Sequence, residues 1–179
     1  MKRLPPKLLS RLAKIKLFVC DVDGVLTDGA IFIGGSREIK RFNIHDGLGL
    51  VLLRRAGIKT AWVSSRPSQA TTMRARELKI TFLVQQKDQL SKAAAIEEIL
   101  AREKLQWNDV CFLGDDIVDL GPLEKAGVGA AVADAVNEAR AAAQFVTRAA
   151  GGHGAVREMV ELILKAQGKW GSISAGYRE

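Results

Sequence analysis

Short apolar runs alternate with helix-like segments along the chain, and this alternation is the feature that most constrains its fold. The runs cover 15–20, 58–63, 80–84, 108–113 and 128–132, and segments with apolar residues three or four apart cover 47–56, 68–79, 91–105 and 154–167. Strands that alternate with helices are typical of a parallel sheet covered by helices. The sequence therefore predicts an α/β fold with a doubly wound, Rossmann-like parallel sheet.

One segment interrupts this alternation directly after the first run. Residues 30–33 and 38–44 are strand-like and flank the glycine turn at 34–36, which indicates a β-hairpin insertion over about 29–46. The hairpin is too small to be a separate cap domain. Because two strands alone are only marginally stable, we expect its apolar residues to pack either on the sheet of the same chain or on another subunit.

Length and composition indicate one ordinary globular domain. The 179 residues contain no linker or repeat, so we expect a single domain over 1–168 and an irregular, flexible tail over 169–179. No apolar stretch approaches the roughly 20 residues of a membrane span, and no signal-peptide core follows the start. This predicts a cytoplasmic protein without membrane contact, in which Cys20 and Cys111 are buried, reduced thiols.

The net charge of +7 indicates an anionic partner. Lysine and arginine are scattered along the chain, without a basic block or the interleaved aromatic residues that stack on bases. We therefore expect a small anionic substrate and no nucleic acid.

The first apolar run ends in Asp21-Val22-Asp23-Gly24. Open α/β sheets bind ligands beyond the carboxyl ends of their strands, and residues two apart in a strand face the same side. A turn at Gly24 lets both carboxylates converge on one reacting centre. Taken alone, such aspartates are more often ordinary turn or helix-capping residues.

Later strand ends carry groups that complement this pair. The second run ends in the hydroxyl residues Ser64 and Ser65, and the fourth run ends in the acidic residues Asp115, Asp116 and Asp119. Between them, Lys92 opens a helix beside its N-cap, Ser91. Hydroxyls, a helix N-terminus and an ammonium group suit phosphate oxygens. Clustered carboxylates repel one another unless a cation or protons compensate, which argues for a divalent metal, and oxygen ligands favour Mg²⁺. The combination predicts metal-dependent phosphate chemistry.

The segments DVDGVLTDG, VSSR, the helix-opening Lys92 and GDDIVD resemble the four motifs of the haloacid dehalogenase superfamily of phosphatases. The glycine hairpin, FNIHDG, AVADAVNEAR, FVTRAAGGHGAVRE and LKAQGK look like the 3-deoxy-D-manno-octulosonate 8-phosphate phosphatase family, and the resemblance spans nearly the whole chain. It implies a capless enzyme of lipopolysaccharide synthesis. It also implies a homotetramer in which a neighbour's hairpin covers each active site.

The resemblance also implies roles for the motif residues. Asp21 attacks phosphorus to form an aspartyl phosphate, while Asp23 protonates the departing sugar oxygen and later activates water. Ser64 binds the phosphoryl group, and Lys92 neutralises it and orients Asp21. Mg²⁺ is held by Asp21, Asp115 and the backbone carbonyl of Asp23, with Asp116 and Asp119 in support.

The chain departs from the family pattern at several positions. Ser64-Ser65-Arg66 stands where Thr-Gly-Arg is usual, so Ser64 takes the threonine's role and Ser65 is the alternative. Lys87 is a weaker alternative to Lys92. The substrate-binding candidates include Arg66 for the sugar carboxylate, together with His45 and His153, which replace common arginines.

These features favour a Mg²⁺-dependent phosphatase for an acidic 2-keto-3-deoxy sugar phosphate, foremost the eight-carbon 8-phosphate. A nine-carbon ulosonate 9-phosphate is the alternative substrate. A receiver-type signalling domain is a more remote alternative, because its phosphoacceptor ends a middle strand, whereas the 58–63 run ends in serines. A silent scaffold is disfavoured since every required group is present.

Overall fold

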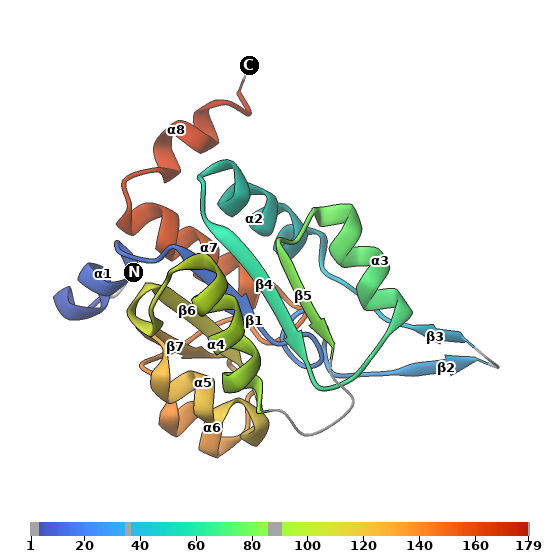
Figure 1. Cartoon of the computed structure of the whole chain (residues 1–179). Coiled ribbons are helices and arrows are strands. Elements are labelled where there is room, and N and C mark those ends of the chain that lie inside the picture. Colours follow the sequence, from blue (N-terminus) through green and yellow to red (C-terminus); the bar gives the residue numbers. More distant parts are fainter. Residues whose placement is uncertain (1–3, 35–36, 86–90, 179) are drawn as a thin grey trace.

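The computed structural model describes residues 4–34, 37–85 and 91–178 and places a six-stranded parallel sheet at the centre of the molecule (Figure 1). The strands lie in the order β5 (Phe82–Gln85), β4 (Lys59–Ser64), β1 (Leu17–Cys20), β6 (Val110–Gly114), β7 (Val128–Ala131) and β8 (Phe145–Val146). Each neighbouring pair is parallel. The predicted doubly wound α/β fold is confirmed.

The central strands are buried on both faces, which is why the sequence shows continuous apolar runs instead of alternation. Every residue of β1 and of β6 is buried. Trp62, Phe18 and Phe112 are the largest fully buried side chains and come from β4, β1 and β6. These three strands therefore form a rigid base for the loops at their carboxyl ends.

Helices cover both faces of the sheet (Figure 1). On one face α2 (Ile44–Arg55) packs on α7 (Ala155–Ala166), with α1 (Pro6–Leu12) against α7 and α3 (Gln69–Leu78) beside α2. The other face carries α4 (Lys92–Glu103), α5 (Leu120–Lys125) and α6 (Asn137–Ala142). Short 3₁₀ turns, Trp107–Asp109 and Ile117–Asp119, precede and follow β6.

The strand order reverses between β1 and β6. From β1 the chain moves outward through β4 to β5, then crosses back through α4 to β6 and continues outward on the other side. A reversal of this kind leaves a crevice at the carboxyl ends of the two strands, where α/β proteins bind ligands. The loops after β1 and β6 border that crevice.

The hairpin consists of β2 (Phe32–Gly34) and β3 (Arg37–Ile39), and it projects from the body of the molecule (Figure 1). Within the described residues it forms a sheet of its own and does not extend the central sheet. The tip of the predicted glycine turn lies outside the described residues. The second strand is shorter than predicted because Asn43 caps α2, its side chain accepting a hydrogen bond from His45 N at 2.8 Å.

The segment after Gly168, predicted to be irregular, contains a helix, α8 (Trp170–Ala175). Side-chain contacts stabilise this helix although its residues favour loops. The cations of Arg157 and Lys165 lie 5.4 and 5.2 Å from the centre of the Trp170 ring. Beyond the helix, the Tyr177 hydroxyl accepts a hydrogen bond from Arg55 at 2.7 Å.

A membrane-spanning helix is not found in the described parts of the chain, since none of their helices is both long and apolar enough. The cytoplasmic location stays a prediction.

We predict that Gly129→Ala destabilises the fold. A Cβ at Gly129 of β7 would overlap the backbone carbonyl of Leu123, which no side-chain rotation relieves. Overpacking of this kind costs about 1–3 kcal/mol, or about 2–10 °C in Tm. Gly171→Ala in α8 is the matched control, because no atom lies near its Cβ position. Thermal unfolding measures both, and an unchanged Tm for Gly129→Ala would contradict the packing.

Candidate active site

Three carboxylates meet at the crevice between β1 and β6. Asp21 follows β1, and Asp115 and Asp119 lie on the loop after β6. One oxygen from each lies within 4.8 Å of the other two. The structure thus brings together the two acidic loops that the sequence places at separate strand ends.

Lys92 lies between two of these carboxylates. Its Nζ is 2.9 Å from Asp21 Oδ2 and 2.7 Å from Asp119 Oδ1, and all three side chains are buried. Burial disfavours the ammonium form of Lys92, but the two carboxylates outweigh this effect and raise its pKa. The lysine is therefore a fixed positive charge beside Asp21. Ser91 caps α4 as predicted, accepting a hydrogen bond from Ala94 N at 3.2 Å.

Asp119 organises the acidic loop. Its second oxygen accepts hydrogen bonds from the backbone N–H groups of Asp115 and Asp116, at 2.9 and 3.3 Å. The fully buried side chain folds back over Gly114, where a Cβ would collide with it. Asp116 is exposed and accepts from Ile117 N at 2.6 Å. The structure thus separates the two residues, with Asp119 inside the site and Asp116 at its outer side.

The electrostatics of the site favour a cation. Burial, opposed by Lys92, raises the pKa of Asp21 to about 6. Burial and the carboxylates of Asp21 and Asp119 raise the pKa of Asp115 to about 8. Asp115 Oδ1 is buried and has no hydrogen-bond partner among the described residues. A hard divalent cation with oxygen ligands would satisfy this orphaned atom and the excess negative charge, so the residues fit such a metal.

The loop after β1 is folded tightly under this site. Gly24 has a φ of +89°, and a Cβ there would overlap the Asp115 carboxylate, so both conformation and space require glycine. The buried Thr27 hydroxyl accepts hydrogen bonds from Gly24 N at 3.3 Å and Gly29 N at 3.2 Å. These contacts fix the conformation of the β1 loop itself.

Asp23, in the same loop, contacts the hairpin segment. Lys40, which follows β3, places Nζ 2.6 Å from Asp23 Oδ1. The sequence analysis missed Lys40 and its neighbour Glu38 as site residues. Period-two alternation gives the signal that would have found them, since Glu38 and Lys40 share one face of the strand and Ile39 points the other way.

The serines after β4 differ in burial. Ser64 is buried, and its hydroxyl both accepts from Arg66 N at 3.0 Å and donates to Arg66 O at 3.1 Å. Ser65 is exposed. The Arg66 guanidinium forms an ion pair with Glu38 of the hairpin. Which hydroxyl binds phosphate therefore stays a prediction.

The two histidines are both exposed but lie in different surroundings. His45 is the second residue of α2 and follows its N-cap, Asn43, by two positions. His153 Nδ1 is 2.7 Å from the carbonyl oxygen of Gly151, and its Nε2 is 3.3 Å from Arg41 Nη2. Gly151 and Gly152 pack on the β1 loop, so His153 lies near the predicted site. Lys87 lies outside the described residues.

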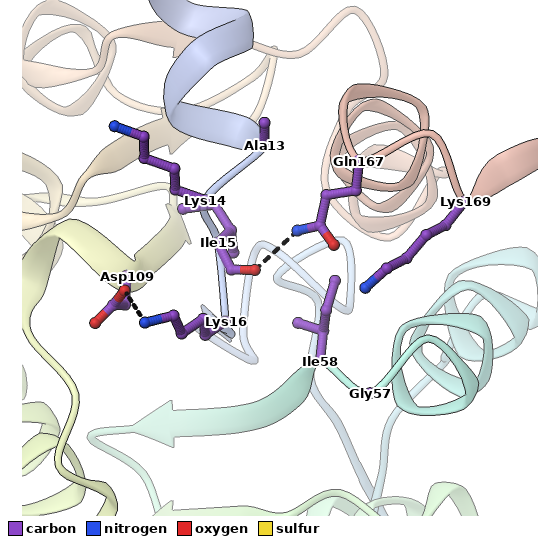
Figure 2. A pocket seen from close by; sticks show the side chains of 9 residues that line it. All are labelled: Ala13, Lys14, Ile15, Lys16, Gly57, Ile58, Asp109, Gln167 and Lys169. Atoms are coloured by element: carbon purple, nitrogen blue, oxygen red, sulfur yellow. Dashed lines mark hydrogen bonds and ion pairs between the residues drawn. The ribbon is translucent and has the colours of Figure 1, made fainter.

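A pocket of about 400 Å³ lies at the opposite edge of the sheet (Figure 2). Its lining comes from the segments that precede β1, β4 and β6 and from the segment that follows α7, and Lys16 pairs there with Asp109 at 2.9 Å. Because it is remote from the carboxylate cluster, we do not assign the reaction to it.

Known proteins share both the sequence and this architecture. A haloacid dehalogenase-like hydrolase family model matches residues 79–159. The 3-deoxy-D-manno-octulosonate 8-phosphate phosphatase of Yersinia pestis is 41% identical over 162 residues, which cover 90% of this chain and 86% of that protein. The chain belongs to this phosphatase family of haloacid dehalogenase-like hydrolases.

Solved structures agree with the assignment. The Moraxella catarrhalis phosphatase of this family, in complex with a magnesium ion, a phosphate ion and a KDO molecule, matches with a TM-score of 0.92 and 36% identity over 96% of this chain and 98% of that one. The cobalt-bound Haemophilus influenzae phosphatase matches with a TM-score of 0.88 and 35% identity, over 94% and 99%. The predicted family is confirmed, and membership argues against a receiver domain.

We predict that the metal-free protein loses stability as pH rises from about 5 to 8. In the unfolded chain the pKa of an aspartate is about 3.9. In the folded chain the pKa is about 6 for Asp21 and about 8 for Asp115, so the folded state binds more protons in this range. Stability therefore falls with rising pH. Tm measured in EDTA tests this.

A divalent cation should weaken the dependence of Tm on pH because it replaces those protons. Asp115→Asn should remove most of that dependence in EDTA. A Tm that rises between pH 5 and 8 in EDTA would contradict the charge balance described for the site.

Proposed function

We propose that this enzyme is a Mg²⁺-dependent phosphatase that converts 3-deoxy-D-manno-octulosonate 8-phosphate to 3-deoxy-D-manno-octulosonate and phosphate. The observation that carries the proposal is the buried cluster at the strand-order reversal, where Lys92 bridges Asp21 and Asp119 next to Asp115. Relatives about 40% identical carry the name of this activity. The reaction proceeds through an aspartyl-phosphate intermediate.

In this mechanism Asp21 is the nucleophile. One Asp21 oxygen attacks phosphorus as the bond to the sugar oxygen breaks, and Asp23 donates a proton to that departing oxygen. Asp23 then removes a proton from a water molecule, which attacks the aspartyl phosphate and releases inorganic phosphate. Covalent catalysis thus replaces one difficult displacement with two easier ones.

The charges around Asp21 suit a phosphoryl group. Lys92 Nζ lies 2.9 Å from Asp21, where it orients the carboxylate and offsets the charge of the phosphoryl oxygens. Ser64 supplies a hydroxyl from the end of β4, with Ser65 as the alternative. The metal would be held by Asp21, Asp115 and the Asp23 carbonyl, and Mg²⁺ supplies positive charge that stabilises the transferring phosphoryl group.

The acidic sugar is recognised by basic and polar groups around the crevice. Arg66 is the candidate for the sugar carboxylate, because one of its guanidinium nitrogens, Nη1, has no hydrogen-bond partner among the described residues. His45 and His153 complete the proposed substrate-binding set. A nine-carbon ulosonate 9-phosphate carries the same carboxylate and phosphate and is the competing substrate.

We further propose a homotetramer in which a neighbour's hairpin covers each active site. Its support is the apolar surface of the hairpin in the single chain. Phe32 and Ile39 are cross-strand partners and are 57% and 63% exposed, and Ile33 is 78% exposed. A two-stranded sheet with such a surface needs a partner to bury it, and a second copy of the chain supplies one.

Phosphate release from a panel of sugar phosphates tests the reaction and the substrate together. We expect Mg²⁺-dependent hydrolysis with a higher kcat/KM for the eight-carbon 8-phosphate than for a nine-carbon 9-phosphate. Asp21→Asn should lower kcat by at least about 10³-fold while the oligomer persists. Turnover of Asp21→Asn at the wild-type rate would exclude Asp21 as the nucleophile.

Disrupting the hairpin surface tests the assembly. Phe32→Asp with Ile39→Asp places charges on the proposed contact, so we expect light scattering to report the 19.4 kDa monomer instead of a tetramer. The same variant should lose kcat/KM for the sugar phosphate. Leu9→Asp, which changes a partly exposed leucine of α1, is the control. A monomeric wild-type protein would exclude the tetramer.

A further inference from the structure

The two aspartates assigned to catalysis are held by different parts of the chain. Lys92 of the central α/β unit contacts Asp21, whereas Lys40 of the hairpin segment contacts Asp23. We propose that Lys40 is a positioning residue that orients Asp23 for proton transfer, an inference that rests on the proposed function.

The surroundings of Lys40 indicate a fixed ammonium group and not a solvated surface lysine. Its side chain is 0% exposed. Nζ lies 2.6 Å from Asp23 Oδ1, 3.2 Å from the Thr71 hydroxyl and 3.6 Å from Glu38 Oε1. A buried cation requires such oxygen partners because water no longer solvates it. Three separate elements therefore fix the position of this charge.

The two oxygens of Asp23 are unequal. Neither oxygen meets hydrogen-bond geometry with a described residue, but Oδ1 forms an ion pair with the Lys40 ammonium at 2.6 Å, whereas Oδ2 has no ion-pair partner among the described residues. Contact through Oδ1 fixes the orientation of the carboxylate and leaves Oδ2 for proton transfer. Orientation matters here, because a displacement of about 1 Å can cost about 10²-fold in rate.

Glu38 connects this arrangement to the loop after β4. Its Oε1 accepts a hydrogen bond from the Ser68 hydroxyl at 2.7 Å, and its Oε2 pairs with the Arg66 guanidinium. Glu38 and Lys40 lie on one face of the strand, and Ile39 on the other face is exposed. Strand β3 thus presents Glu38 toward the catalytic loops on one face, and on the other face Ile39 lies exposed beside its cross-strand partner Phe32.

Lys40 could instead only anchor the hairpin, and the two roles predict different kinetics. Loss of an anchor would lower the rate of hydrolysis of every substrate by the same factor. Loss of Asp23 orientation slows only the steps that move a proton. Phosphate esters with alcohol leaving groups need a proton on the departing oxygen, whereas p-nitrophenolate leaves without one.

Lys40→Met tests the proposal by comparing two substrates. We expect kcat for the sugar phosphate to fall about 10²-fold or more, with KM within about threefold. The pre-steady-state burst of p-nitrophenolate from p-nitrophenyl phosphate should stay within about threefold of wild type. Asp23→Asn should show the same pattern, and the double variant should be no slower than Asp23→Asn alone.

Thr71→Val removes another contact of Lys40 and leaves the Asp23 contact in place. Because Thr71 helps to fix Lys40, we expect a partial loss of kcat, smaller than that of Lys40→Met and again confined to the sugar phosphate. Lys125→Met, the matched control at an exposed lysine that pairs with Glu97, should leave kcat unchanged. An equal loss on both substrates for Lys40→Met, or an unchanged kcat for the sugar phosphate, would overturn the positioning role.

A stability measurement separates failure of this proposal from failure of the proposed function. If Lys40 holds Asp23, Lys40→Met should lower Tm markedly in the wild-type background and much less in the Asp23→Asn background. Equal losses in both backgrounds would overturn the pairing whatever the substrate. A wild-type protein that hydrolyses neither ester would overturn the proposed function, and the Tm comparison would still decide the pairing.

Discussion

The site depends on the ion pairs of one ammonium group, that of Lys92, which two carboxylates share. It contacts Asp21 and Asp119 in a buried setting, and Asp115 joins them within 4.8 Å. With all three carboxylates ionised, one positive charge leaves an excess of two negative charges, which burial makes costly. This excess matches the charge of one divalent cation. The fit of the site to such a cation thus follows from its buried charges.

The sheet topology makes this charge arrangement possible. The strand order reverses between β1 and β6, so the carboxyl ends of both strands face one crevice. The chain crosses back to β6 through α4, whose first residue is Lys92. A single reversal therefore brings together Asp21, the acidic loop and the lysine between them. The tight turn at Gly24 completes the arrangement, because only glycine fits beside Asp115.

The sequence predicted the parts of this structure that depend on local pattern. Each buried strand is a continuous apolar run, so the strand ends, and with them Asp21, Ser64 and Asp115, could be located without coordinates. The short helices α1, α5, α6 and α8 were missed, because six or seven residues are too few for a helical period to emerge. In α8 the contacts of Trp170 with distant cations decide the conformation, and composition does not contain them.

Period-two alternation places Lys40 on one face with Glu38, but the burial of Lys40 could not be inferred from local pattern. A lysine at the end of a projecting hairpin is ordinarily solvated, and its burial depends on long-range contacts with Asp23 and Thr71. The hairpin follows the β1 loop in the sequence. The segment after its second strand packs back on that loop, which places Lys40 against Asp23.

Two carboxylates only two positions apart thereby acquire different partners. Asp21 pairs with Lys92 of the central α/β unit, whereas Asp23 pairs with Lys40 of the insertion. Distinct surroundings of this kind suit the roles proposed for the two carboxylates, Asp21 as nucleophile and Asp23 as acid and base. The insertion after the first strand is therefore tied to the chemistry of Asp23 as well as to the outer surface of the molecule.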